Sequence, residues 1–208
     1  MKRWLAMGLG LVLLLGLAGC GVSGEVREAK PVIYLYPEEE TQVSVQLEFN
    51  GQLTAAYPAY GDGWTVIAQP DGTLTDPETG REYYCLFWEG TSGTDYDFSQ
   101  GFVVPGAETA AFLEEALSQL GLTEREANEF LIYWLPRMEG NAYNLIAFQQ
   151  ESYTETAALT IDPAPDTLLR VFMAWKGLEE PVDIPPQTLE PTERTGFTVV
   201  EWGGAELT

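Results

Sequence analysis

The clearest pattern in the chain is a strict alternation of apolar and polar residues over positions 43–49. Such alternation predicts a β-strand with one buried face. The Asn50-Gly51 pair that follows favours a hairpin. Because strand register follows the apolar face, we expect a three-residue loop, 50–52, that pairs Phe49 with Leu53.

Other strands are predicted from runs of β-branched and aromatic residues. Two of these runs, residues 83–88 and 168–175, are apolar on both faces, which is typical of strands in the middle of a sheet. The remaining strand candidates are residues 32–36, 53–57, 64–68, 143–149, 158–161 and 197–202.

Helical periodicity occurs in one part of the chain. Residues 108–120 place their large apolar side chains on one stripe, and Gly121 ends that helix. The capping box Thr123-x-x-Glu126 opens a second helix, which we expect to stop at Pro136. The pattern predicts an α+β fold: mostly antiparallel, sandwich-like sheets of about nine strands with one central helical hairpin.

The first twenty residues have the pattern of an export signal. Lys2 and Arg3 precede an apolar run over residues 5–17, which is shorter than the ~20 residues of a membrane span. The run ends in Leu-Ala-Gly-Cys at 17–20, which resembles the lipobox of bacterial lipoproteins. The resemblance implies cleavage before Cys20, a lipid on its sulfur, and anchoring on the extracytoplasmic face of the cell membrane. An ordinary signal peptide with a chance cysteine is the alternative.

These patterns divide the chain into four parts. We expect a signal peptide over 1–19, the lipidated cysteine and a flexible tether over 20–30, and one globular β-rich domain over 31–204. Residues 205–208 are expected to form a tail.

The charge of the chain limits its partners. The formal net charge is −22, and removal of Lys2 and Arg3 with the signal leaves 8 basic and 32 acidic side chains, a net charge of −24. A body this negative repels phosphate backbones and anionic lipid surfaces, so we expect no nucleic-acid partner. Contact with the membrane must therefore come from the lipid on Cys20.

The absence of histidine removes several classes of chemistry. The chain has no histidine, which excludes Ser-His-Asp and Cys-His catalysis and His-ligated zinc. A lipidated Cys20 leaves Cys85 without a disulfide partner, and its apolar strand predicts a packing role rather than a reactive thiolate. We find no phosphate-binding or dinucleotide-binding motif, and we expect neither a cofactor nor a metal.

Carboxylates are the remaining candidates for catalysis. Glu89, Glu139 and Glu201 stand beside the ends of predicted elements, where two converging acids could serve a glycoside hydrolase. Solvated or salt-bridged acids are the simpler interpretation among 32 acidic residues. Glu89 is also a candidate ligand-binding residue.

Aromatic and charged residues suggest a binding function. Trp88 and Trp202 adjoin acids at predicted strand ends and are candidates for an aromatic platform under sugar rings, with core packing as the alternative. Arg170 lies among apolar neighbours, so it either forms a buried ion pair or anchors a ligand carboxylate. Asp95 and Asp97 are further candidate ligand-binding residues on a polar loop, although this loop does not match the twelve-residue calcium loop.

Several longer stretches of the chain are distinctive: residues 30–37, 86–89, 133–136, 170–173, 194–197 and 201–204. Together they resemble an uncharacterised family of exported bacterial and fungal proteins, over nearly all of residues 30–204. The resemblance implies a single domain and assigns no activity or catalytic residue.

We therefore expect a membrane-anchored extracytoplasmic lipoprotein that acts as a ligand-binding or accessory module for a glycan or peptide. A structural or protein-interaction lipoprotein and a carboxylate-based glycoside hydrolase are the alternatives. An open groove with an aromatic floor would favour glycan binding, whereas a pocket with two converging carboxylates would favour the hydrolase.

Overall fold

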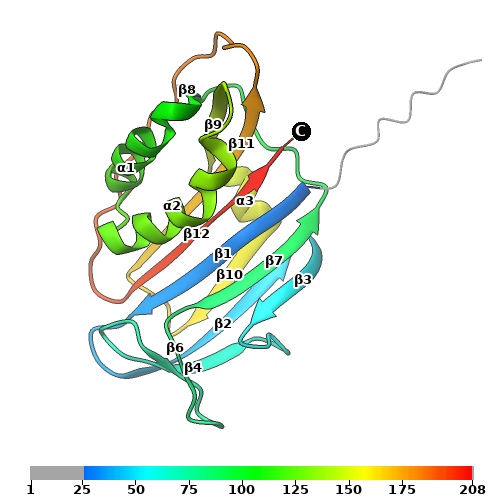
Figure 1. Ribbon diagram of the computed structural model, residues 1–208. Helices are drawn as coiled ribbons and strands as arrows, with labels where there is room; N and C mark the ends of the chain where they lie inside the picture. The colour runs from blue at the N-terminus through cyan, green and yellow to red at the C-terminus, as the bar shows by residue number, and fades with distance from the viewer. Residues whose placement is uncertain (1–25, 208) are drawn as a thin grey trace, which may run out of the picture.

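A seven-stranded sheet forms the centre of the fold in the computed structural model, which describes residues 26–207 (Figure 1). All neighbouring strands in it are antiparallel except β11 and β12. Its order is β3 (Gly51–Tyr57), β7 (Leu86–Ser92), β1 (Val26–Tyr36), β12 (Thr198–Glu206), β11 (Thr167–Leu178), β9 (Tyr143–Gln149) and β8 (Phe102–Pro105).

A five-stranded antiparallel sheet packs against one face of the seven-stranded sheet. The core between the two sheets contains alternate residues of β1, such as Ile33 and Leu35, together with Trp64 and Phe172. The order of the smaller sheet is β10 (Ala157–Asp162), β2 (Thr41–Phe49), β4 (Trp64–Ala68), β5 (Leu74–Thr75) and β6 (Glu82–Tyr83).

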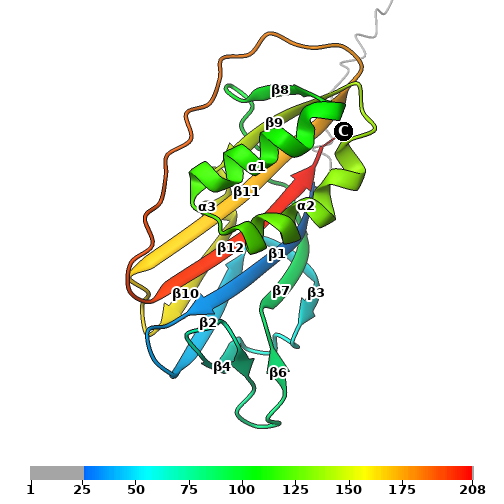
Figure 2. The same cartoon turned by 60° about the vertical axis from the view of Figure 1, so that its left-hand side comes forward.

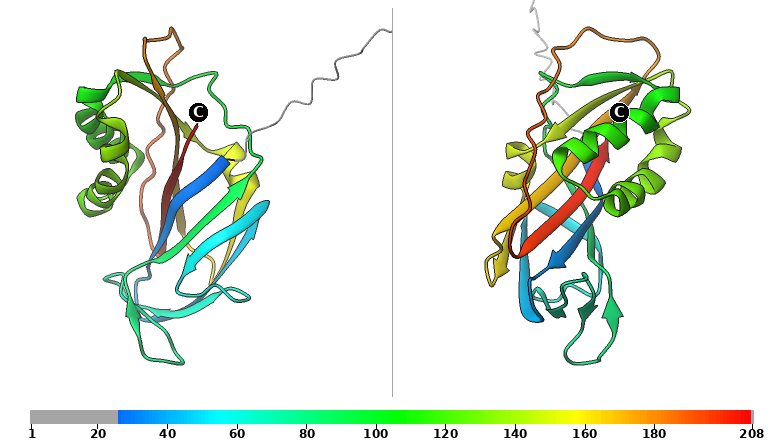
Figure 3. Two further views of the ribbon diagram at one scale, coloured as in Figure 1. Left: turned by 45° about the vertical axis from the view of Figure 1, so that its right-hand side comes forward. Right: turned by 90° about the vertical axis from the view of Figure 1, so that its left-hand side faces the viewer.

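Two helices cover the opposite face of the seven-stranded sheet. Helices α1 (Thr109–Leu120) and α2 (Glu124–Met138) form a hairpin that lies over β9, β11 and β12 and leaves β7 and β3 uncovered (Figure 2). Their apolar stripes bury a second core with the other face of the sheet. The helices and the smaller sheet thus lie on opposite sides of the large sheet (Figure 3). A 3-10 turn η1 (Gly106–Glu108) precedes α1, and a short helix α3 (Glu151–Thr156) follows β9.

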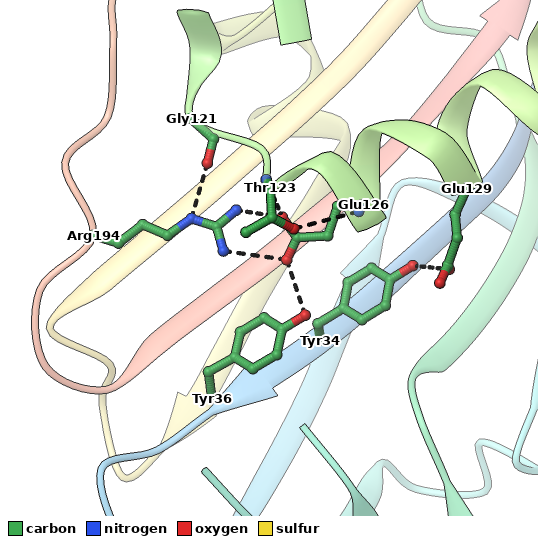
Figure 4. Close-up of polar contacts among 7 residues, drawn as sticks. All are labelled: Tyr34, Tyr36, Gly121, Thr123, Glu126, Glu129 and Arg194. Carbon is green, nitrogen blue, oxygen red and sulfur yellow. Dashed lines mark hydrogen bonds and ion pairs between the residues drawn. The ribbon is translucent and has the colours of Figure 1, made fainter. Parts of the chain in front are cut away.

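The start of α2 is fixed by the capping box and by residues from distant strands (Figure 4). The Thr123 side chain accepts a hydrogen bond from the Glu126 amide, and the Glu126 carboxylate accepts one from the Thr123 amide at 2.8 Å. The same carboxylate accepts a hydrogen bond from the Tyr36 hydroxyl at 2.9 Å and pairs with Arg194. Arg194 also donates from Nε to the Gly121 carbonyl at 2.9 Å, so one guanidinium joins the end of α1 to the start of α2.

The structure confirms the predicted fold class and the helical hairpin. It has twelve strands rather than nine because β5, β6 and β8, of two, two and four residues, are too short to show a periodicity in the sequence. Helix α2 continues through Pro136 to Met138 instead of stopping. Proline leaves the carbonyl four residues earlier without its helical partner, and Ile132 is 75% exposed, so water can bond that carbonyl.

The predicted hairpin between residues 43–49 and 53–57 is wrong. Strand β2 pairs with β10 and β4, whereas β3 pairs with β7 in the other sheet. The chain changes sheets at Asn50, whose amide donates to the Thr156 carbonyl at 2.7 Å. Gly51 then passes so close to β7 that a Cβ atom there would lie 2.3 Å from the Thr91 carbonyl oxygen. Alternation predicted the buried face of β2 correctly, but not the sheet that the next strand joins.

The ends of the domain also differ from the prediction. Strand β1 begins at Val26, so residues 26–30 of the expected tether are part of the sheet, and β12 continues to Glu206 into the expected tail. The predicted signal peptide and Cys20 lie outside the described residues. Within residues 26–207, every helix is too short or too polar to span a lipid bilayer.

Candidate functional site

An open cavity of about 590 Å³ lies where the helical layer ends, above the uncovered β1–β7–β3 side of the large sheet. Its walls come from four strands (β1, β3, β6 and β7), from the segment that links β6 to β7, and from one side of α2. We call it the aromatic pocket after Tyr57, Tyr83, Tyr84, Phe87 and Tyr133, and it is also lined by Lys30, Glu82 and Glu89.

The floor of the aromatic pocket continues a row of apolar side chains that begins in the core. Cross-strand register places Trp202, Val32, Phe87 and Tyr57 side by side across four strands. Trp202 is fully buried beneath the helices, Phe87 is half-buried, and Tyr57 is 56% exposed. The row therefore leaves the core and becomes accessible at the point where the helices end.

The aromatic walls come from separate elements. Tyr83 packs edge-on against Tyr57, with ring centroids 5.5 Å apart. Tyr84 is 54% exposed and lies 6.5 Å from the ring of Tyr34 on β1. Tyr133 projects from α2 on the other side. Exposed large aromatic side chains gathered around one concavity are the usual composition of a ligand-binding surface.

Lys30 gives the aromatic pocket an unusual polar element. The pairing of β1 with β7 changes register around Lys30. The φ of Lys30 is 58°, in the left-handed region, and no other non-glycine residue among 26–207 has a positive φ. Its amide donates to Oε1 of Glu89 at 3.3 Å, and Arg27 pairs with Oε2 of the same carboxylate. The Lys30 ammonium lies 6.0 Å and 5.6 Å from the ring centres of Phe87 and Tyr133.

Burial sets the protonation of the nearby weak acids. Burial first, and then the charge of Glu129, raises the pKa of the Cys85 thiol to about 11. Burial likewise raises the pKa of Tyr133. Both groups are therefore neutral at physiological pH, and each offers a hydrogen-bond donor to the pocket, a hydroxyl from Tyr133 and a thiol from Cys85.

The three predicted catalytic acids are not brought together. Glu89 lines the aromatic pocket, whereas Glu201 lies on the other face of the same sheet, where it accepts from Trp88 Nε1 at 3.1 Å. Glu201 also pairs with Arg170, whose Nε donates to it at 2.7 Å. Glu139 is exposed at the end of α2. Arg170 is thus engaged in a buried ion pair and does not face a ligand site.

Trp88 and Trp202 do not form the platform that their positions suggested. Both are fully buried, and they belong to the cores on opposite faces of the seven-stranded sheet. The sequence placed them at strand ends, but β7 continues to Ser92 and β12 to Glu206. Each tryptophan therefore sits inside its strand, where burial of a large apolar side chain is most favourable.

Asp95 and Asp97 lie on an exposed loop. Asp97 accepts hydrogen bonds from the Ser99 amide at 2.7 Å and hydroxyl at 2.9 Å, and these bonds lower its pKa. It also borders a polar cleft of about 550 Å³ beside Gln149 and α3. Across residues 26–207, no three acidic or cysteine side chains gather in a way that could hold a metal ion.

Sequence reasoning found Glu89 but missed the other residues of the aromatic pocket. The tyrosines at 57, 83 and 84 were assigned to strands by their β propensity, and their exposure depends on how far the helices extend over the sheet. Lys30 belongs to one of the stretches that resemble the exported family, but its left-handed backbone has no signal in the sequence.

Comparisons with known proteins give a narrow result. No family model matches the chain, and no solved structure matches it. Over 85 residues the chain is 42% identical to a Butyrivibrio fibrisolvens protein described as an uncharacterized protein in the bglA 3' region. The match covers 38% of this chain and 86% of that protein.

Proposed function

This chain belongs to the same family as the uncharacterised Butyrivibrio fibrisolvens protein, and we propose that its domain binds a glycan in the aromatic pocket while a lipid on Cys20 holds it at the outer face of a membrane. The relative's description assigns no activity, so the support for this function comes from the pocket and from the first twenty residues.

The observation that carries the proposal is the exposure of Tyr57 and Tyr84 around one concavity. Sugar rings present apolar C–H faces that pack on aromatic rings, and their hydroxyls need donors and acceptors at the rim. The aromatic pocket has five rings for the first purpose and the polar groups of Lys30, Glu82 and Glu89 for the second. Its volume of about 590 Å³ falls within the ~300–1,000 Å³ of small-ligand sites.

The lipid anchor is supported by the sequence pattern alone. The apolar run and the Leu-Ala-Gly-Cys motif precede the first described strand, and β1 begins six positions after Cys20. An anchored domain of this kind would hold its glycan close to the membrane surface. A lipid suits this domain because a body with a net charge of −24 after cleavage before Cys20 is not attracted to anionic headgroups.

The proposal is tested with residues 21–208, which lack the signal and Cys20. Binding of neutral and acidic oligosaccharides and of peptides is measured by calorimetry and by the shift in melting temperature, since a ligand specific to the folded state stabilises it. We expect a sugar to bind, and we expect Tyr57→Ala and Tyr84→Ala each to weaken it by about five-fold or more through the loss of ring contacts.

Ile132→Ala is the matched control, because Ile132 is a large apolar side chain, 75% exposed, on α2 outside the aromatic pocket. It should leave the affinity unchanged. The glycan proposal fails if no sugar binds at millimolar concentration, if only peptides bind, or if both tyrosine variants bind as tightly as the unaltered domain.

A further inference from the structure

The aromatic pocket contains one positive charge that no acidic side chain neutralises. Every ion pair among residues 26–207 uses an arginine, and the Lys30 ammonium has no carboxylate oxygen within 4.0 Å. Its near neighbours are the ring faces of Phe87 and Tyr133. These ring faces attract a cation but supply no hydrogen-bond acceptor of normal strength.

From this arrangement we infer that the glycan bound in the aromatic pocket carries a carboxylate, as a uronic acid residue does, and that the Lys30 ammonium binds it. This inference rests on the proposed glycan-binding function and adds the chemical class of the ligand.

Glu89 contacts the Lys30 backbone, and both of its carboxylate oxygens are already occupied. Oε1 accepts the Lys30 amide at 3.3 Å and Oε2 pairs with Arg27. The left-handed backbone of Lys30 directs its amide to Glu89 while its ammonium lies over the two rings. A left-handed backbone is strained for a non-glycine residue, so the strand keeps a strained lysine at the wall of the pocket.

Glu82 is the second acid of the aromatic pocket, and it differs from Lys30 in exposure. Glu82 is exposed, so solvent screens its charge, whereas Lys30 is half-buried. A ligand that fills the pocket removes water mainly from the ammonium. That loss is unfavourable unless the ligand supplies an acceptor, and a carboxylate supplies a stronger one than a hydroxyl.

The net charge of −24 that remains without the signal does not oppose a single ligand carboxylate. At physiological ionic strength, exposed charges more than about 8 Å apart are largely screened, so the half-buried ammonium dominates inside the pocket. A densely charged polyanion would be repelled by the rest of the surface. The expected ligand is therefore a mostly neutral glycan with isolated acidic residues.

The test compares a uronate-containing oligosaccharide with the same oligosaccharide after its carboxyl group has been reduced to the alcohol. Calorimetry on residues 21–208 should show that the acidic sugar binds about ten-fold more tightly. Lys30→Gln should bind the two sugars with similar affinity, while Lys30→Arg should retain a preference for the acid. Lys176→Gln, which removes another ammonium that lies over an aromatic ring, is the control and should keep the ten-fold ratio.

A measurement on the unaltered domain makes the result independent of how the variants fold. The preference for the acidic sugar should shrink as NaCl is raised, because an ion pair is screened by salt. Equal binding of the two sugars, or tighter binding of the reduced one, overturns the inference and leaves the glycan-binding function intact. If neither sugar binds, the proposed function fails as well.

Discussion

At the scale of single residues, the ion pair between Arg170 and Glu201 places two opposite charges inside the core. The two residues are direct neighbours in the parallel pair of β11 and β12, and their side chains are 9% and 0% exposed. The Arg170 guanidinium also lies 4.6 Å from the ring centre of Tyr153. Burial alone would lower the pKa of Arg170, but the charge and hydrogen bond of Glu201, together with the contribution of Tyr153, outweigh it and the pKa is raised. Arg170 is therefore always charged and needs its counterion.

We predict that Glu201→Gln lowers the free energy of unfolding by about 3–5 kcal/mol, because it leaves a buried charge without a partner. Urea unfolding followed by fluorescence measures this loss. The double variant Arg170→Met with Glu201→Leu should recover most of the stability, since it removes both charges together.

Glu139→Gln is the control for Glu201→Gln, because Glu139 is exposed and should change stability by no more than about 0.5 kcal/mol. A loss below about 1 kcal/mol in Glu201→Gln would show that the pair is dispensable.

This pair shows how far residue-level prediction can go. A charged Arg170 inside an apolar strand needs a carboxylate partner, and the sequence predicted this need. Its partner could not be chosen among 32 acidic residues, because the choice depends on β11 and β12 being neighbours in the sheet.

At the scale of secondary-structure elements, the start of α2 connects the helical hairpin to the sheet. Two tyrosines of β1 donate to glutamates of α2: Tyr36 to Glu126, and Tyr34 to Glu129 at 2.6 Å (Figure 4). Arg194 reaches Glu126 from the segment before β12. Glu126 is 1% exposed, so this capping residue is also a buried anion held by three elements.

We predict that Glu126 makes the fold sensitive to acid. Burial acts to raise the pKa of its carboxyl, but hydrogen bonds from Arg194 and Thr123 hold the pKa below its ordinary value of 4.5. A lowered pKa in the folded state adds stability above the ordinary value, and that stability is lost as the pH falls through the folded pKa. Unfolding free energies measured from pH 7 down to pH 3 should therefore fall more steeply in the unaltered domain than in Glu126→Gln.

The difference between the two pH profiles isolates Glu126 from the other acids. Glu28, which is also buried, has a raised pKa because of its burial, and its contribution runs in the opposite direction in both proteins. Parallel profiles would mean that Glu126 contributes no acid sensitivity.

The positions of the helices and strands along the chain were predicted better than the strands with which they pair. Periodicity located the helical hairpin, the buried face of β2, and strands such as β9, because each signal is contained in a few consecutive residues. The partner of β3 depended on where the chain crosses between sheets, and the aromatic pocket depended on where the helices stop covering the large sheet. Neither is a local property, so the sequence pattern could not supply the hairpin partner or most of the pocket residues.

At the scale of the whole molecule, the layers explain why a pocket exists. The smaller sheet covers one face of the large sheet, but the helical hairpin covers only part of the other (Figure 3). The strands that remain uncovered carry Phe87 and Tyr57 at the end of an apolar row. The aromatic pocket thus lies where the core between the helices and the large sheet reaches solvent. Its lining is aromatic because it continues the apolar face of that sheet.

We predict that Cys20→Ser in the full-length chain abolishes incorporation of a labelled fatty acid and releases the protein from the membrane fraction. The thiol of residue 20 is the expected attachment atom, and two or more acyl chains are needed for stable anchoring. Cys85→Ser is the matched control: Cys85 is half-buried at the aromatic pocket, and its loss should leave the label in place. Retention of the label in Cys20→Ser would contradict the proposed anchor.

The position of β1 has a consequence for the order in which the molecule is made. The first strand lies between β7 and β12, and its register pairs Ile33 with both Leu86 and Glu201. The centre of the large sheet therefore cannot close until residues 198–206 have been synthesised. Contacts between segments far apart in a chain form late, because they require closure of a very long loop. During synthesis β1 would therefore lack one of its two neighbouring strands until β12 has left the ribosome.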